Sequence, residues 1–139
     1  MVSKQVIKRR LQQITRCIHK IERFTELSLK EYENNEDSQD IVEYNLFIAI
    51  NMMVDIAMHI VVDLKLGAPA TMTEAFHILH KNGFFTEEET ALYSKMTGLR
   101  NLISHGYLNI KNEIIFNIIK NHLKDLKQFI LTVELKVLT

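Results

Sequence analysis

Four side chains that can bind or react with a phosphodiester lie close together near the end of a predicted helix. Arg100, Asn101, His105 and Tyr107 all fall in the run RNLISHGY. An arginine presents a planar fork of donors that holds and neutralises a phosphate. A histidine titrates near neutrality and can transfer protons. Together, the arginine and the histidine suit phosphodiester cleavage.

The helical spacing within this run decides which side chains can act together. Asn101 and His105 are one turn apart, so the amide can hold the imidazole in one tautomer and orientation. Arg100 and Ser104 share the neighbouring face, whereas Arg100 and His105 are about 140° apart on a regular helix. Joint action therefore requires either that the helix end near Ser104, which Gly106 permits, or that the long arginine reach around. On spacing alone, a charge cluster that satisfies the helix C-terminus explains the same residues.

Composition and periodicity predict the elements that position this run. The chain has 139 residues, 47% of them hydrophobic, with only four glycines and one proline, which leaves little room for the turns of a β protein. Apolar residues recur at steps of three and four, and two capping-box patterns, Thr71-x-x-Glu74 and Thr86-x-x-Glu89, mark helix starts. We expect an all-α, up-and-down bundle of four main helices plus a short extra helix, forming a single domain over residues 1–139. The predicted helices cover 7–32, 41–66, 71–83, 86–106 and 112–137.

The charge balance excludes a global electrostatic field but leaves room for a local one. Seventeen basic and seventeen acidic residues give a net charge of zero. Residues 1–23 nevertheless carry seven Lys and Arg against one acid, Glu22. A basic helix of this kind can supply phosphate contacts to a nucleic acid, and a solvated basic face without a ligand explains the same count.

Cysteine usage and hydropathy bear on the cellular compartment. The single cysteine, Cys17, lies in an apolar helical pattern, which predicts a reduced, buried thiol. The N-terminal segment has basic residues without an apolar stretch behind them, and no run approaches about 18 consecutive apolar residues. We therefore expect a cytoplasmic protein without a membrane span.

The predicted helix 41–66 is apolar almost all round, apart from a polar stripe at i, i+4 spacing that contains Asn51, Asp55, His59 and Asp63. This surplus apolar surface indicates a two-fold homodimer interface, and a central helix in a monomer explains it equally. In a dimer, Asp55 and His59 would line the cleft. They could also be two metal ligands, but no Cys or HExxH pattern supplies the others, so we predict no metal.

The run Arg100-Asn101-x-x-x-His105-x-Tyr107 resembles the motif of the HEPN superfamily, specifically the HepT-like ribonuclease toxins of HepT/MntA toxin–antitoxin pairs. The resemblance covers about residues 40 to 135. It includes the helix with Asp55 and His59, the Pro69 connection and the segment TEAFHILHKNGFF, all in that family's order. This sequence departs from the family at Gly106, where members often have a bulky residue.

The resemblance implies a helical bundle, a symmetric homodimer whose two motifs face one cleft, and RNA cleavage without a metal or other cofactor. Arg100 and His105 would be the catalytic pair, and Asn101 the polar residue that orients them. In some members the partner nucleotidyltransferase, the MntA-like antitoxin, attaches AMP to the motif tyrosine, which would be Tyr107. Asp55, His59 and Ser104 would line the cleft.

We therefore predict a metal-independent endoribonuclease that acts as a toxin. The RNA's own 2′-hydroxyl would be the nucleophile, with His105 transferring protons and Arg100 stabilising charge on the phosphate. The alternative hypothesis is a non-catalytic adaptor that binds a nucleotide or a nucleotidyltransferase through the same cleft.

Overall fold

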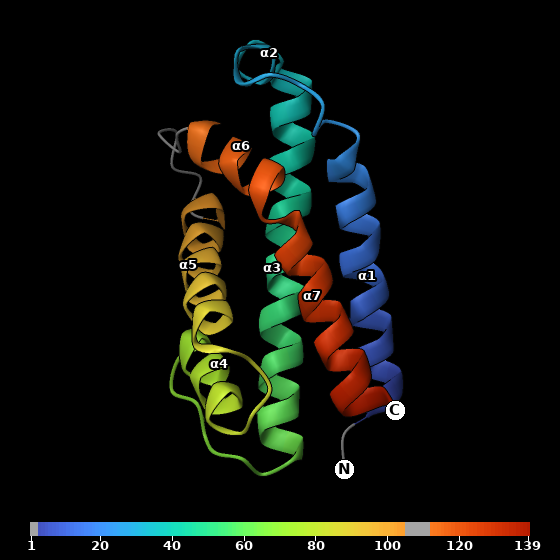
Figure 1. Ribbon diagram of the computed structural model, residues 1–139, viewed down its shortest axis with the longest axis vertical. Coiled ribbons are helices and arrows are strands. Elements are labelled where there is room, and N and C mark those ends of the chain that lie inside the picture. The colour runs from blue at the N-terminus through green and yellow to red at the C-terminus, as the bar shows by residue number, and fades with distance from the viewer. Residues whose placement is uncertain (1–2, 105–111) are drawn as a thin grey trace.

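The computed structural model describes residues 3–104 and 112–139, and within these ranges every regular element is a helix (Figure 1). The predicted all-α class is thus confirmed. In chain order the elements are α1 (Lys4–Glu22), α2 (Leu29–Glu33), α3 (Glu36–Asp63), α4 (Met72–Lys81), α5 (Glu87–Ser104), α6 (Asn112–Asn121), α7 (Leu123–Val133) and a π-helical turn, η1 (Glu134–Leu138).

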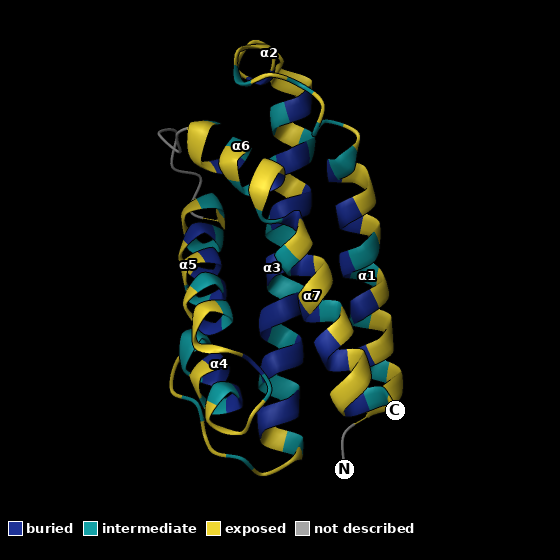
Figure 2. Ribbon diagram, in the orientation of Figure 1, coloured by how far each residue is buried: buried dark blue, intermediate teal, exposed yellow. Residues whose placement is uncertain are grey.

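The long helix α3 runs through the middle of the molecule. In Figure 1, α1 lies on one side of α3, α4 and α5 lie on the other, and α7 crosses in front. Buried positions recur along almost the whole of α3 in Figure 2. By length and composition alone α3 could cross a membrane, which our sequence expectation did not anticipate, but 56% of its most apolar window is buried inside this fold. A core helix is expected to have this composition.

Helix α1 packs one apolar stripe against α3, as its periodicity predicts. The buried residues of α1 are Ile7, Leu11, Ile14, Cys17, Ile18 and Ile21. The helix ends at Glu22 and does not continue to Tyr32, which corrects the predicted boundary. A separate helix, α2, begins with a complete capping box in which Ser28 and Glu31 bond to each other's backbone N–H groups. The Ser28-x-x-Glu31 pattern is visible in the sequence and could have revealed this break.

Helix α3 begins earlier and ends earlier than its apolar pattern predicts. The Asn35 side chain accepts a hydrogen bond from the Ser38 N–H, so residues 36–40 form the start of α3 and not a loop before it. At the other end, the Leu66 N–H donates to the Val61 carbonyl and Lys65 has a positive φ of 56°. This arrangement is a Schellman motif with lysine in the position that glycine usually occupies.

Both predicted helix starts are confirmed, but the capping box is complete only at Thr86, because the Glu74 carboxylate accepts from the Ala70 N–H and not from Thr71. The Thr71 side chain accepts from the Glu74 N–H at the start of α4, and Thr86 and Glu89 form a reciprocal capping box at the start of α5. Gly83 follows α4 with φ of 80°, a left-handed conformation that glycine adopts without steric cost.

The final predicted helix, 112–137, is wrong as a continuous element. It breaks at His122 into α6 and α7 and ends in the turn η1. The buried positions Ile115, Ile119, Leu123 and Leu126 keep helical spacing across the break, so periodicity could not show it. The break lets α6 pack near α2, where the Phe116 and Tyr32 rings are 5.7 Å apart, while α7 runs along α1.

An aromatic cluster fixes the first half of α5. Tyr93 of α5 packs against Phe85 at 5.1 Å, Phe129 of α7 at 5.5 Å and Phe76 of α4 at 5.7 Å between ring centroids. Tilted and edge-on aromatic pairs of this kind add to the free energy gained by burial. The cluster therefore holds α4, α5 and α7 together at the end of α5 opposite Arg100.

Candidate active site

Arg100 lies in the last turn and a half of α5 and points toward α3. Its Nε donates to the Asn51 Oδ1 atom of α3, and its Nη1 donates to the Asn101 Oδ1 atom at 2.8 Å. The guanidinium carbon also lies 5.5 Å from the centroid of the Phe47 ring, which is within the range of a cation–π contact. Three contacts therefore hold a half-buried guanidinium in one place before any substrate arrives.

The rotation of α5 explains why Arg100 faces α3. Tyr93, Met96, Thr97 and Leu99 are the buried residues of the middle of this helix, so the neighbouring position 100 lies at the edge of the buried face. The Thr97 hydroxyl donates to the Tyr93 carbonyl at 2.9 Å, which satisfies its polar atom inside the core.

An open surface pocket of about 390 Å³ lies beside Arg100, and we call it the Arg100 cavity. Its lining residues come from α3, from Arg100 itself and from the first residue of α4; they are Asn51, Met52, Val54, Asp55, Met58, Met72 and Arg100. One wall is polar and the other is made largely of methionine side chains, which adapt their shape readily. Such a cavity can receive a phosphate beside Arg100 and a less polar group against the methionines.

The structure describes only some of the other residues of the predicted motif. The predictions for His105, Gly106 and Tyr107 fall outside the described residues. The side-chain oxygen of Asn101 accepts a hydrogen bond from Arg100. Only the NH₂ group of its amide is therefore left to orient an imidazole. The Ser104 hydroxyl donates to the Asn101 carbonyl at 3.0 Å and its side chain is exposed, and its place in a cleft stays a prediction.

Asp55 lines the cavity with Arg100 and is also paired with a cation from α1. The Nε of Arg10 donates to Asp55 Oδ2, and the Nε2 atom of His59 is 4.0 Å from Asp55 Oδ1. The carboxylate that a metal would need is thus already neutralised by Arg10. Within residues 3–104 and 112–139, no three His, Cys, Asp or Glu side chains come together as a metal site would require.

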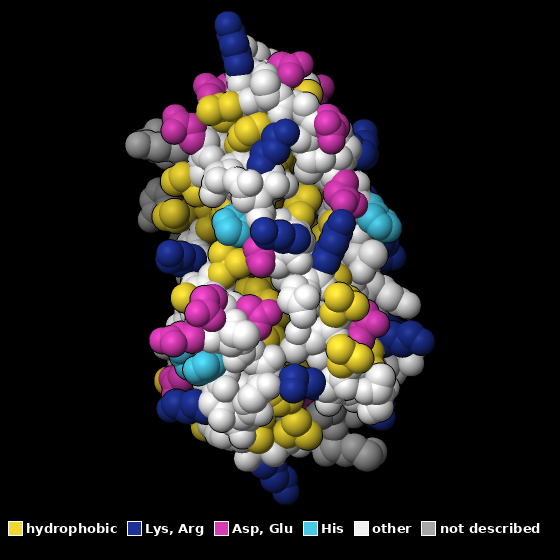
Figure 3. Space-filling model, viewed as in Figure 1, with side chains coloured by type: hydrophobic (Ala, Val, Ile, Leu, Met, Phe, Trp, Pro, Cys, Tyr) yellow, Lys and Arg dark blue, Asp and Glu magenta, His cyan; other side chains and the backbone are white. Residues whose placement is uncertain are grey.

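The basic residues of α1 do not form one surface. Arg10 reaches the α3 side, whereas Lys4, Lys8 and Arg16 line a cavity of about 700 Å³ between α1 and the C-terminal helices. On the face shown in Figure 3, basic and acidic side chains are interspersed. A phosphate-binding role for this helix stays a prediction, and among its described cations Arg10 is the one bonded to a residue that lines the space beside Arg100. Cys17 is buried as predicted, and burial raises the pKa of its thiol.

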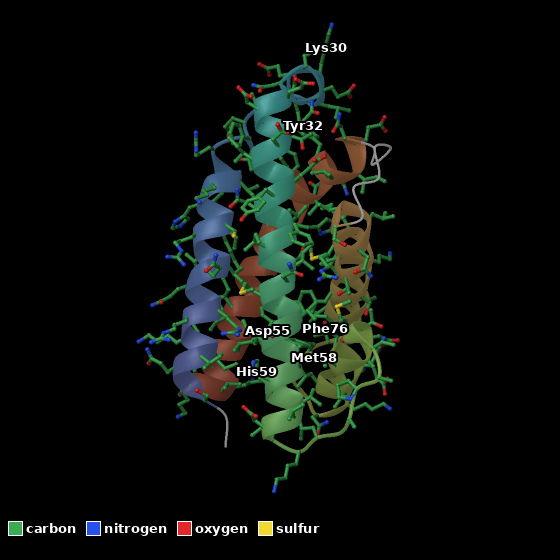
Figure 4. All side chains as sticks on the ribbon, turned by 180° about the vertical axis from the view of Figure 1, so that it is seen from behind. Lys30, Tyr32, Asp55, Met58, His59 and Phe76 are labelled. Atoms are coloured by element: carbon green, nitrogen blue, oxygen red, sulfur yellow. The ribbon has the colours of Figure 1, made fainter. Side chains whose placement is uncertain are left out.

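Residues 3–104 and 112–139 leave one side of α3 only partly covered. We call this surface the α3 stripe: it contains the exposed Tyr44 and Val62 and the half-buried Ile48, Asn51, Met52, Asp55, Met58 and His59. Figure 4 shows Asp55, Met58 and His59 on this side, between α1 and the α4–α5 pair. Most apolar residues of α3 are buried within the chain, as the central-helix explanation predicts, whereas Tyr44 and Val62 remain exposed on the stripe. A homodimer through this stripe stays a prediction.

Comparison with known proteins places this chain and its fold in a family. A family model described as ribonuclease HepT-like matches residues 14–133. The chain belongs to the HepT-like family of HEPN proteins, as the sequence resemblance indicated.

Particular relatives agree over most of the chain. The mRNA nuclease HepT of Shewanella oneidensis is 30% identical over 125 residues, which cover 90% of this chain and 93% of the relative. The tRNA nuclease HepT of Aphanizomenon flos-aquae is 32% identical over 111 residues, which cover 80% of this chain and 76% of the relative. A solved structure of a tri-AMPylated Shewanella oneidensis HEPN toxin in complex with an MNT antitoxin has 29% identity and a TM-score of 0.86, covering 94% of this chain and 98% of that one.

Three residues of the site were not assigned from the sequence. Asn51 was recognised as part of a polar stripe but not as the partner of Arg100. The sequence places Phe47 in a predicted apolar helix and Arg10 among seven basic residues near the N-terminus, and it indicates no site role for either. The i, i+4 spacing of Asn51 and Asp55 was the one signal available, because contacts between residues more than forty positions apart leave no mark in a single sequence.

Proposed function

We propose that this chain is an endoribonuclease that acts in the cytoplasm as the toxin of a toxin–antitoxin pair, with residues 1–139 as its catalytic domain. The observation that carries the proposal is the fixed guanidinium of Arg100 beside a cavity, in a chain that belongs to the HepT-like family. The names of both curated relatives, which are nucleases, support the same activity.

Arg100 would bind the scissile phosphate and stabilise the charge that develops on it. Its donors are aimed before the substrate binds, so little reorganisation is needed in the transition state. Asn51 is uncharged, and for that reason the arginine keeps its full positive charge for the phosphate. A carboxylate in the same place would neutralise it.

His105 would transfer the protons. It takes the proton of the RNA 2′-hydroxyl as the 2′-oxygen bonds to phosphorus, and the bond from phosphorus to the 5′-oxygen breaks. The leaving 5′-oxygen receives a proton, from the same histidine or from His105 of a second copy. The products are a 2′,3′-cyclic phosphate and a 5′-hydroxyl, and the chain itself supplies the cation and the proton-transfer group, so no metal is required.

The partners follow from the same proposal. The substrate is RNA, and the antitoxin is an MntA-like nucleotidyltransferase. The working form is a homodimer in which the α3 stripes of the two copies face each other, with Asp55 and Arg10 at the cleft that the RNA enters. The complex of a related HEPN toxin with an MNT antitoxin supports the antitoxin partner. Tyr107 would accept AMP, and the added bulk and charge would block phosphate entry.

The decisive experiment uses the purified chain and a defined RNA. Cleavage should persist in excess chelator, give 2′,3′-cyclic phosphate ends and stop when one 2′-deoxy nucleotide is placed at the scissile position. Arg100→Ala and His105→Ala should each abolish cleavage, whereas Arg23→Ala, which removes an exposed arginine beside Phe24, should not. Loss of activity in chelator with recovery on adding a divalent ion would overturn the mechanism.

The same variants test the adaptor alternative. If the chain is an enzyme, His105→Ala should abolish its toxicity to growing cells, while the variant should still bind the nucleotidyltransferase. An adaptor has no cleavage to lose, so wild-type protein without detectable nuclease activity that still binds the nucleotidyltransferase would favour that alternative.

A further inference from the structure

The ion pair between Arg10 and Asp55 joins α1 to the α3 stripe at the edge of the candidate active site. Both side chains are partly exposed, at 31% for Arg10 and 39% for Asp55. Pairs this exposed contribute little to the stability of a fold, since water screens them and ordering long side chains costs entropy. Stability alone therefore gives a weak reason for an arginine and an aspartate at these positions.

The position of the pair relative to Arg100 is more informative. Asp55 follows Asn51 by one helical turn, which is about 6 Å along α3. Asn51 accepts from Arg100, Asp55 accepts from Arg10, and both Asn51 and Asp55 line the same cavity. Helices α1 and α5 lie on opposite sides of α3 (Figures 1 and 4). Since Arg10 bonds to Asp55 and Arg100 bonds to Asn51, the two arginines reach neighbouring turns of α3 from these two helices.

The two arginines differ in the charge of their partners. Arg100 is held by a neutral amide and keeps its net positive charge, whereas Arg10 is held by a carboxylate. Only the Nε of Arg10 is engaged by Asp55, and a guanidinium has five N–H donors, so its other nitrogens can still bind an anion. The Asp55 charge reduces the attraction that this anion feels.

We propose that Arg10 is a substrate-binding residue that contacts an RNA phosphate next to the one at Arg100, and that Asp55 is its built-in counter-ion. The inference rests on the proposed function, because it assigns the second contact to the same RNA strand. Asp55 keeps Arg10 extended over the α3 stripe when no RNA is bound. It also weakens RNA binding, which favours release of the cleaved strand.

Opposite effects of two single substitutions test this role. The probe is a short RNA with one 2′-deoxy nucleotide at the scissile position, and the measurement is its dissociation constant by fluorescence anisotropy at several salt concentrations. Arg10→Ala should raise Kd about tenfold and reduce the slope of log Kd against log salt by about 0.7, the value for one phosphate contact on a single strand. Asp55→Asn should lower Kd about threefold, because the repulsive charge is gone.

The matched control is Arg9→Ala, an exposed arginine on the same helix. It removes the same charge and should change Kd less than twofold. Arg10→Lys keeps the charge without the planar fork and should fall between wild type and Arg10→Ala. Thermal unfolding of each variant separates binding from folding, since a purely structural ion pair would lower the melting temperature in both Arg10→Ala and Asp55→Asn and would not shift Kd in opposite directions.

The outcomes separate this inference from the proposed function. If Arg100→Ala abolishes cleavage but Arg10→Ala binds RNA like Arg9→Ala, the role of Arg10 is overturned and the function stands. If Asp55→Asn weakens binding, Asp55 is not a counter-ion that opposes RNA. If Arg100→Ala cleaves normally, the proposed function fails, and the inference fails with it.

Discussion

Arg100 of α5 donates its Nε–H to the side-chain oxygen of Asn51, which precedes it by 49 residues on α3. This bond is one of the contacts that connect the helix carrying the motif to the central helix of the fold. The amide fixes the guanidinium without neutralising it. One turn further along α3, the second arginine of this surface, Arg10, is bound to a carboxylate.

Replacement of Asn51 should reduce the rate of RNA cleavage without unfolding the chain. Asn51→Ala removes the acceptor, so the guanidinium loses its fixed direction, and we expect the single-turnover cleavage rate to fall about tenfold to a hundredfold. Asn51→Asp keeps an acceptor but adds a negative charge, so RNA binding should weaken as well. Asn121→Ala, on the exposed end of α6, is the control. A wild-type cleavage rate in Asn51→Ala would show that Asn51 does not position Arg100 for catalysis.

Phe47 should contribute a smaller effect through its ring. Phe47→Leu keeps an apolar side chain but loses the cation–π contact with Arg100, and we expect about a threefold loss in kcat/KM. Phe84→Leu removes a similar contact, with Lys136 at 5.9 Å, on a different part of the molecule. Equal activity losses in the two variants would mean that the ring over Arg100 has no special role.

The α3 stripe should be the homodimer interface. Light scattering at micromolar concentration should give a mass near twice the 16.3 kDa of the chain. Tyr44 is 64% exposed and Val62 is 58% exposed, so Tyr44→Glu and Val62→Glu should shift the mass toward the monomer because they place charge in an apolar contact. Leu135→Glu changes an equally exposed apolar residue of η1 and should leave the dimer intact. A wild-type mass near 16.3 kDa would contradict the dimer.

Tyr107 should carry AMP when the chain is expressed with its nucleotidyltransferase. Mass spectrometry should place the added AMP on the peptide with Tyr107, and Tyr107→Phe should remain unmodified and toxic in the presence of the partner. Unmodified Tyr107 in a neutralised complex would refute this mode of inhibition.

Glu43 should make stability depend on pH. Burial raises the pKa of its carboxyl, and the nearby charge of Asp40 raises it further. The folded state therefore favours the protonated acid, so this contribution is present at low pH and is lost as pH rises through the folded-state pKa. Glu43→Gln should raise the melting temperature by about 1–3 °C at pH 7 and by much less near pH 4. Glu87→Gln, at an exposed position, should show no such difference, and an equal shift at both pH values would contradict the argument.

The fold could be predicted where a local interaction determines it, and not elsewhere. The caps at Thr71 and Thr86 and the apolar stripe of α1 follow from short-range spacing, and all are present. The break at His122 was missed because the buried residues on either side preserve helical spacing. No glycine or proline marks the position.

The candidate site likewise contains residues that the sequence indicates and residues that it does not. Residue type and motif predict that Arg100 binds a phosphate, and this role stays a prediction. The neutral partner Asn51 and the ring of Phe47 depend on how α5 packs on α3, and this packing depends on the whole core.

The two ends of α5 are held by different kinds of contact, and this difference sets how heat should inactivate the protein. Tyr93, near the beginning, is locked among aromatic rings from three segments, whereas beyond Leu99 the turn with Arg100 is only partly buried and depends on a few polar bonds. Losing those bonds misdirects the guanidinium but exposes little apolar surface. Activity should therefore disappear on warming while the helical bundle is still folded, and it should return on cooling.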